Sequence, residues 1–385
     1  MASKDLLSDD DIRRWYENLA RGSELTADKN LRLLARFCRL NETPPGQIID
    51  DYREDKKGFV DRLMDFIEAQ RNGVGNGGRQ RAASYLREYL VVLSSWLRHH
   101  GEEPPRGIKV GDTRATPTLR EERIPTKEEL RAILHRARPR ARAIIALMAF
   151  SGLRPQVLGT GRGTDGLRIR DLTDFDVRGG SVSVQRSPAR IDVPRQLSKA
   201  GHGYFTFLSE EGCDILKAYL QARLDRGEDL VAESAVIRVT PGYESKGRGR
   251  ESRNRDSQFL VTGNIGREIR DAFGEGFKQR PYVLRSYFDT NLLYSEAKEG
   301  VPRDFRVFWM GHVGDIEHRY TTHKLLPPEM VETMRGAYAK AEPFLSTVSF
   351  TMEVKPSEVE ILEEDLAELV ERLVEEKLRE RLPGS

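Results

Sequence analysis

One segment decides how this chain is organised: Phe308-Trp-Met-Gly-His-Val-Gly-Asp-Ile-Glu-His-Arg-Tyr320-Thr-Thr-His-Lys324. We expect one helix to end at Trp309–Met310 and a new helix to begin near Asp315. Gly311 and Gly314 permit the turn, and Asp315 can cap the next helix through its side-chain oxygen. A histidine at such a corner and a tyrosine on the next helix could converge on one small anion. A buried tyrosine and ordinary polar histidines would give the same pattern.

The composition is that of a soluble globular protein: 38% of the residues are hydrophobic and 32% are charged. A chain of 385 residues is too long for one ordinary core, which favours two domains and a tail. The net charge is only +2, so any DNA-binding face must come from local segregation of charge. Cys38 and Cys213 lie in apolar helical patterns, as reduced core thiols do. The first residues, Met1-Ala-Ser-Lys-Asp, lack the hydrophobic core of a signal peptide, and the longest apolar run, residues 143–150, is too short to span a bilayer. We therefore expect an intracellular protein without a membrane segment.

The first hundred residues have the apolar spacing of helices throughout. We expect helices over Asp11–Ala20, opened by Ser8, from Thr26 onward, and over Arg79–His100. The turn Gly73-Val-Gly-Asn-Gly-Gly78 matches G-x-G-x-x-G, but helices flank it where a dinucleotide site needs a strand. We therefore expect a helix–helix loop at this position.

Changes in composition suggest four parts of the chain. We assign a helical domain to residues 1–100, a polar linker to 101–123, a catalytic domain to 124–348 and a charged helix to 355–382. Leucines in the last helix alternate at spacings of four and three, as in a short coiled-coil seam. We expect residues 357–382 to contact another protein, and packing of this helix on its own domain is an equal alternative.

Two motifs early in the second domain carry cations. An apolar helix over Arg140–Phe150 ends in Ser151-Gly-Leu-Arg154, so Arg154 could face a cleft or cap helix carbonyls. Period-two patterning then predicts short strands, among them Arg190–Val193 and Tyr204–Leu208. Lys199 lies in the glycine-containing turn between these two strands, where an ordinary surface lysine is the simpler interpretation.

A third motif begins at Arg280-Pro-Tyr-Val-Leu-Arg285. Pro281 predicts the first turn of a helix, which would place Tyr282 and Arg285 on one helical face. Backbone N–H groups at a helix N-terminus favour an anion. The motif therefore predicts a second point of anion contact.

Two further groups of cations could contact DNA phosphates, or could simply form solvated surface. One lies beside the glycine-rich turn and the other in a basic loop: Arg79, Arg81 and Arg87, and Lys246, Arg248 and Arg250.

In these motifs the chain resembles the tyrosine recombinase (phage integrase-like) family, most closely its archaeal, Xer-like integrases. The family's first box matches Ser151-Gly-Leu-Arg154, and its hairpin lysine matches Lys199. Its second box matches Tyr282-Val-Leu-Arg285-Ser-Tyr-Phe-Asp-Thr290, and its closing histidine and tyrosine match Met310-Gly-His312 and Tyr320-Thr. The resemblance covers roughly residues 8–345, although the helical half matches by architecture more than by motif.

The resemblance implies a mainly α fold with a small antiparallel β-sheet. An N-terminal helical, SAM-like core-binding domain would precede an α+β catalytic domain and a C-terminal helical tail. The implied activity is site-specific DNA cleavage and rejoining through a 3′-phosphotyrosyl intermediate on Tyr320, without ATP, metal or another cofactor. The implied partners are double-stranded DNA with a specific recombination site and further copies of the chain, in a tetramer on that DNA. A cytoplasmic, nucleoid-associated location would follow.

The resemblance also assigns a role to each matched residue. Arg154 and Arg285 would bind the nonbridging phosphate oxygens, and His312 would add a hydrogen bond. Lys199 would protonate the leaving 5′-oxygen. Tyr282 stands where the family usually has histidine or lysine, which makes it a hydrogen-bond donor only by inference. Tyr320 could serve its own site or that of a neighbouring protomer.

Two other functions share part of this pattern. A type IB topoisomerase would use the same chemistry as a monomer and relax supercoils without a partner site. A DNA-binding architectural protein would have a silent site, and the presence of Arg154, Arg285, His312 and Tyr320 argues against it.

Overall fold

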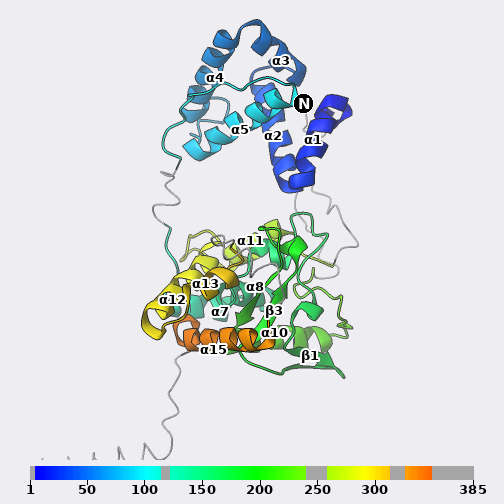
Figure 1. Cartoon of the computed structure of the whole chain (residues 1–385), viewed down its shortest axis with the longest axis vertical. Coiled ribbons are helices and arrows are strands. Elements are labelled where there is room, and N and C mark those ends of the chain that lie inside the picture. The colour runs from blue at the N-terminus through cyan, green and yellow to red at the C-terminus, as the bar shows by residue number, and fades with distance from the viewer. Residues whose placement is uncertain (1–4, 114–121, 240–257, 313–325, 349–385) are drawn as a thin grey trace, which may run out of the picture. The chain divides into compact units, whose positions relative to one another are not determined.

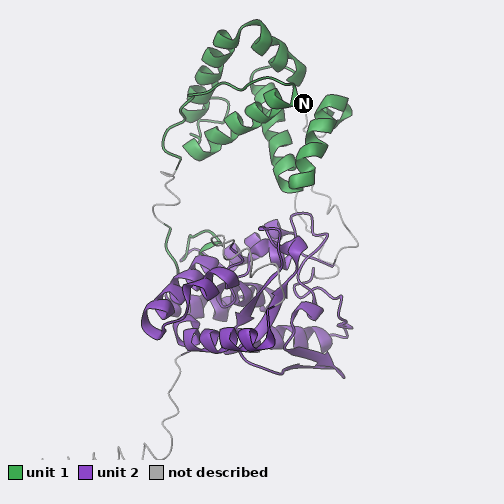
Figure 2. Cartoon of the chain, in the orientation of Figure 1, with its two compact units in different colours: residues 1–124, 277–283 green, residues 125–276, 284–385 purple. Residues whose placement is uncertain are grey.

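The computed structural model describes residues 5–113, 122–239, 258–312 and 326–348. The chain divides into two compact units (Figure 2). Residues 1–124 and 277–283 form the first, and residues 125–276 and 284–385 form the second. The described residues are mainly helical with two small two-stranded antiparallel sheets, which confirms the predicted fold class.

The described part of the first unit is built from helices (Figure 1). They are η1 (Asp5–Ser8), α1 (Asp10–Gly22), α2 (Glu24–Leu40), α3 (Pro45–Glu54), α4 (Lys56–Arg71) and α5 (Ala83–His99).

Two helix starts in this unit differ from the prediction. The α1 helix is capped by Asp9, whose Oδ1 accepts hydrogen bonds from the backbone N–H of Asp11 and Ile12. The α2 helix is capped by Ser23, which accepts from the N–H of Thr26. Ser8 belongs to the preceding 3-10 turn instead. Thr26, predicted to open the second helix, is the third residue of α2.

The α5 helix begins at Ala83, four residues later than predicted. The glycine-rich loop extends up to it, because Asn76 donates to the carbonyl of Arg79 and accepts from Arg81. Gly73 has φ +84, and a Cβ there would meet the backbone of Gly78 at 2.6 Å, so this turn requires glycine. The segment is a helix–helix loop, as predicted.

Aromatic side chains fill the core of the first unit. Trp15 and Trp96 meet edge to face with centroids 5.4 Å apart, and the Trp96 indole donates to the carbonyl of Pro45. Residues 101–113, assigned to a linker, contact this unit: the Tyr52 hydroxyl donates to the Glu103 carbonyl at 2.6 Å, and Val110 is only 6% exposed. This part of the segment is therefore packed on the helices.

The second unit mixes helices with two hairpins (Figure 1). Its described elements are α7 (Lys127–Arg136), α8 (Pro139–Ala149), α9 (Pro155–Leu158), η2 (Ile169–Asp171), β1 (Phe175–Arg178), β2 (Ser181–Val184), β3 (Ala189–Val193), η3 (Arg195–Leu197), β4 (Tyr204–Leu208), α10 (Glu210–Leu224), α11 (Thr262–Phe273), α12 (Val283–Glu299), α13 (Arg303–Trp309) and α15 (Pro328–Leu345).

The centre of this unit is α8, whose residues 143–149 are all completely buried. Helices α7, α10 and α11 pack against it. Because every side of α8 is buried, its sequence is a continuous apolar run. Strands β3 and β4 pair antiparallel, with Val193 opposite Tyr204, which confirms the predicted hairpin.

Polar contacts fasten the end of α15 to the second unit. The Glu211 carboxylate accepts from the Ser346 hydroxyl at 2.9 Å and from the Thr347 backbone N–H at 2.7 Å. Lys127 donates to the Pro343 carbonyl at 2.5 Å, and the Glu342 carboxylate accepts from the N–H of Glu210 at 2.5 Å. These bonds hold the chain at the point where it leaves α15.

Both cysteines are free and buried, as expected, and burial raises the pKa of each thiol to about 12. Within the described ranges, no helix combines the length and the apolar character that a membrane crossing needs.

Candidate active site

Arg154 is presented by a tight turn after α8, which we call the Arg154 turn (residues 150–154). Gly152 has φ +66, and a Cβ there would lie 2.4 Å from the ring of Phe288. Only glycine fits this close approach. Arg154 then occupies the N-cap position of α9 without a side-chain capping bond. Its Nη1 atom is buried and has no hydrogen-bond partner among the described residues, so the side chain is not used to cap helix carbonyls there.

Arg285 joins the Arg154 turn to the segment that carries His312. It stands in the first turn of α12 and is completely buried. Nη1 donates to the carbonyl of Gly152, and Nη2 donates to the carbonyl of Met310. Nη2 also lies 3.4 Å from His312 Nε2. A buried guanidinium needs such acceptors, and here they come from two motifs far apart in sequence.

His312 follows α13 in the His312 turn (residues 310–312). The Gly311 and His312 N–H groups donate to Phe308 and Val307 carbonyls at 2.8 and 3.2 Å, and Gly311 has φ +56. This is the glycine-terminated helix end that the sequence predicted.

The surroundings of His312 favour its uncharged form. Loss of solvent around the ring lowers its pKa most, although the residue stays partly exposed. The cations of Arg285 and Arg154 lower the pKa further, and the carboxylate of Asp289 partly opposes them. We therefore take the imidazole as neutral at pH 7.

The β3–β4 hairpin touches both turns. The Tyr204 ring packs so closely on Gly311 that a Cβ there would lie 2.5 Å from it. The buried Thr206 hydroxyl donates to the Ser151 carbonyl at 2.9 Å. Lys199 is exposed in the connection between the strands, and none of the described residues forms a hydrogen bond or ion pair with its side chain. The hairpin thus anchors the base of the loop that carries Lys199.

The prediction that Tyr282 shares a helical face with Arg285 is wrong. Helix α12 begins at Val283, and the Val283 N–H donates to the Arg280 carbonyl at 3.0 Å. Pro281 therefore occupies the second position of a β-turn instead of the first turn of the helix. Tyr282 is 46% exposed, whereas Arg285 is completely buried.

The other residues predicted for the site or for DNA contact fall into two groups: those outside the described residues and those in the first unit. Tyr320, the basic-loop residues Lys246, Arg248 and Arg250, and the C-terminal helix at 357–382 lie outside the described residues. The remaining cations belong to the first unit. There Arg79 and Arg87 are exposed, whereas Arg81 bonds to Asn76 and lies over the Tyr85 ring at 4.6 Å. Arg81 therefore helps to hold its own loop.

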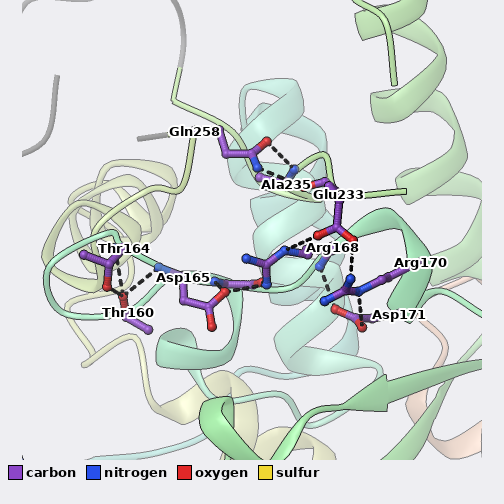
Figure 3. A network of polar contacts seen from close by, with 10 residues as sticks. Thr160, Thr164, Asp165, Arg168, Arg170, Asp171, Glu233, Ala235 and Gln258 are labelled. Atoms are coloured by element: carbon purple, nitrogen blue, oxygen red, sulfur yellow. Dashed lines mark hydrogen bonds and ion pairs between the residues drawn. The ribbon is translucent and has the colours of Figure 1, made fainter. Parts of the chain in front are cut away.

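The glycine-rich loop after α9 has a structural role (Figure 3). The Thr160 hydroxyl accepts from the N–H groups of Thr164 and Asp165 at 3.1 and 3.3 Å. Arg168 pairs with Asp165 at 2.5 Å and with Glu233 at 3.1 Å. The loop's own hydroxyl, carboxylate and backbone groups are joined to one another by these bonds. It supports the chain immediately beyond Arg154 and α9.

Sequence reasoning missed Tyr204, Thr206 and Arg306 as parts of the site's framework. Tyr204 and Thr206 lie two residues apart on the predicted strand at Tyr204–Leu208. The sequence pattern does not tell which part of the chain their side chains contact. Asp289 was quoted within the second box without a role. Its spacing of four residues from Arg285 was the one available signal.

Among the described residues, no group of three or more His, Cys, Asp or Glu side chains could hold a metal ion. The described part of the site is thus a cluster of cations and one imidazole. Such a cluster can bind an anion and stabilise charge that develops on it.

No protein-family model matches the chain, and no curated protein matches it. Solved structures do. A XerA recombinase is 18% identical with a TM-score of 0.34, and the match covers 85% of this chain and 96% of the other. An integrase from mycobacterium phage Brujita is 16% identical with a TM-score of 0.38, covering 88% and 94%. The Tn1549 transposon integrase in complex with circular intermediate DNA is 12% identical with a TM-score of 0.44, covering 84% and 97%. At such low identities and scores, the functional assignment rests on the site residues.

Proposed function

We propose that the protein is a site-specific DNA recombinase that cleaves and rejoins strands through a covalent bond to Tyr320. One observation carries this proposal: Arg285 bonds to both the Arg154 turn and the His312 turn and lies beside His312. Two cations and a neutral imidazole from three separate motifs therefore meet at one place. A phosphodiester, with its single negative charge and two nonbridging oxygens, fits such a group.

The reaction follows from the residue types. The Tyr320 oxygen attacks the scissile phosphorus, its hydroxyl proton leaves to solvent, and the bond from phosphorus to the DNA 5′-oxygen breaks. The transition state carries extra charge on the nonbridging oxygens. Guanidinium groups remain protonated and are held in place, so they stabilise that charge without reorganisation. Arg154 has one buried donor, Nη1, without a hydrogen-bond partner among the described residues, and in this proposal a nonbridging oxygen becomes its acceptor.

In this proposal Arg285 contributes both charge and structure. Its two terminal nitrogens already donate to backbone carbonyls, so it adds positive charge beneath the phosphate and fixes the geometry of both turns. His312, neutral at pH 7, can donate one hydrogen bond to the phosphate. Lys199, on the exposed hairpin connection, supplies the proton for the 5′-oxygen. The resulting 3′-phosphotyrosyl ester keeps the strand end activated for rejoining, which removes any need for ATP.

The test is a trapping experiment. DNA bound by the protein is selected from the host or element genome, and a nicked duplex of that sequence is used as a suicide substrate. We expect a covalent protein–DNA adduct that resists denaturation. Tyr320→Phe should abolish it, because the nucleophilic oxygen is gone. The matched control is Tyr294→Phe, which removes the hydroxyl of an exposed tyrosine, 58% accessible, and should leave the adduct unchanged.

Adduct formation by Tyr320→Phe would show that another residue is the nucleophile. Relaxation of a supercoiled plasmid without a selected site would favour the topoisomerase alternative. Copies of the chain should assemble as a tetramer when two sites are paired, and this can be followed by light scattering.

Chelation gives an independent prediction. Because protein cations carry the charge stabilisation in this proposal, EDTA should leave the rate of adduct formation unchanged. A loss of activity in EDTA that Mg²⁺ restores would contradict the mechanism.

A further inference from the structure

Three charged side chains connect α12, which carries Arg285, to α13, which precedes His312. Asp289 and Glu296 belong to α12, and Arg306 belongs to α13. Figure 1 labels both helices. Arg306 Nη1 donates to Asp289 Oδ1 at 2.7 Å, and its Nε donates to Glu296 Oε2 at 3.0 Å. The Arg306 side chain is only 16% exposed. A guanidinium with two carboxylates is a firm connection between the helices.

This connection fixes the position of His312. The Met310 N–H donates to the carbonyl of Arg306 at 3.1 Å, and the His312 N–H donates to that of Val307 at 3.2 Å. His312 is therefore attached to the same helical turn as Arg306. Since Arg306 binds that turn to α12, and α12 carries Arg285, the distance from Arg285 to His312 depends on Arg306.

The same side chains set the electrical environment of the imidazole. From α12, Arg285 and Asp289 face His312; from α13, Arg306 does; and from the Arg154 turn, Arg154 does. Asp289 is the only anion among these groups. It follows Arg285 by four residues, on the same face of α12, and its carboxylate is bound by Arg306. Removing either member of this pair leaves one uncompensated charge near the ring.

We propose that Arg306 and Asp289 are positioning residues for the site: their ion pair holds His312 beside Arg285 and balances the charge next to the imidazole. The importance of Arg306 and Asp289 for catalysis rests on the proposed function. The charge of His312 itself can be measured on the free protein, without DNA.

The experiment compares Arg306→Met with Asp289→Asn. The imidazole signals are titrated by NMR, and the His312 signal among the seven histidines is assigned by its loss in His312→Gln. Arg306→Met removes a cation and releases an anion, so the pKa of His312 should rise. Asp289→Asn removes the anion, so the pKa should fall further. The pH dependence of adduct formation should shift in the same opposite directions.

Two further variants control for folding and for simple loss of packing. Arg306→Lys keeps the charge and should shift the His312 pKa less than Arg306→Met. Glu296→Gln removes the other carboxylate bound to Arg306 and leaves the Asp289–Arg306 pair in place. Its effect on His312 should be smaller than that of Asp289→Asn. If Arg306→Met fails to fold, the comparison of Asp289→Asn with Glu296→Gln still decides.

The proposal is wrong if the His312 pKa does not move in Asp289→Asn, or moves equally in Glu296→Gln. A shift of the same sign in Arg306→Met and Asp289→Asn would also contradict it. The charges predict His312 pKa shifts of opposite sign, and a pair that acts only through structure has no reason to give them. If the shifts occur as predicted and the wild-type protein forms no adduct, the proposed function fails and the account of His312 stands.

Discussion

Arg154 and Arg285 carry the same charge and should respond very differently to truncation. Arg285 is completely buried and donates to two carbonyls, so Arg285→Ala leaves a cavity and two unsatisfied acceptors. We expect it to lower the free energy of unfolding by at least about 3 kcal/mol. Arg154 is half-buried with an unpartnered Nη1, so Arg154→Ala should change stability by less than about 1 kcal/mol. Its rate of adduct formation should nevertheless fall about 10²- to 10³-fold.

Urea denaturation and single-turnover trapping of both variants check this contrast. Arg154→Lys keeps the charge without the planar fork and should recover only part of the lost rate. Normal adduct formation by Arg154→Ala would remove Arg154 from the site.

At the scale of elements, spacing along the sequence predicted the existence of several elements, although not always their first residue. The continuous apolar run of α8 and the hairpin around Lys199 follow from spacing alone, and both occur in the structure. The prediction failed at Tyr282, because proline suits both a β-turn and a helix start. The choice between them depends on surroundings that a local pattern does not contain.

In the candidate site too, local motifs could be predicted from the sequence and tertiary contacts could not. Arg154, Arg285 and His312 could be found by their motifs. What Arg285 binds could not, since its acceptors are backbone carbonyls, which every residue has. The Asp289–Arg306 contact likewise joins separate helices, and its existence depends on how α12 and α13 pack.

The anchored end of α15 gives a prediction about pH. Burial raises the pKa of Glu342 from 4.5 to about 7. The folded state therefore holds this proton more tightly than the unfolded state, and stability should fall as the pH rises from 4.5 to 7. The full difference corresponds to about 3 kcal/mol. Glu342→Gln stays neutral and can still accept from Glu210, so it should be more stable than the wild type at pH 8 and similar at pH 5.

Thermal unfolding at both pH values measures this effect. Glu329→Gln, on the exposed first turn of the same helix, is the matched control and should follow the wild type. A Glu342→Gln variant less stable than the wild type at pH 8 would mean that the carboxylate is ionised and needed there.

At the scale of the whole molecule, residues 122–123, at the end of the first unit's main segment, are bound to residues 277–283, which lead into α12. Arg280 binds Glu122 through two hydrogen bonds, each of 2.6 Å, and the Arg123 guanidinium lies over the ring of Phe277, which is 4% exposed. Residues 277–283 accordingly group with the first unit, although the second unit flanks them in sequence. Arg285 follows two residues after this segment. The Glu122–Arg280 pair therefore lies close in sequence to the start of the helix that holds Arg285.

We expect this ion pair to hold the segment before α12, and with it the position of Arg285. Because Arg280 is 48% exposed, the pair should contribute no more than about 1 kcal/mol, which corresponds to a rate change of about fivefold at most. Glu122→Arg and Arg280→Glu should each slow adduct formation by about that amount without unfolding the protein. The double variant restores the pair with its charges exchanged and should recover most of the rate. A double-mutant cycle measures the coupling energy. Additive losses of rate would show that Glu122 and Arg280 act independently, and that their ion pair does not affect Arg285.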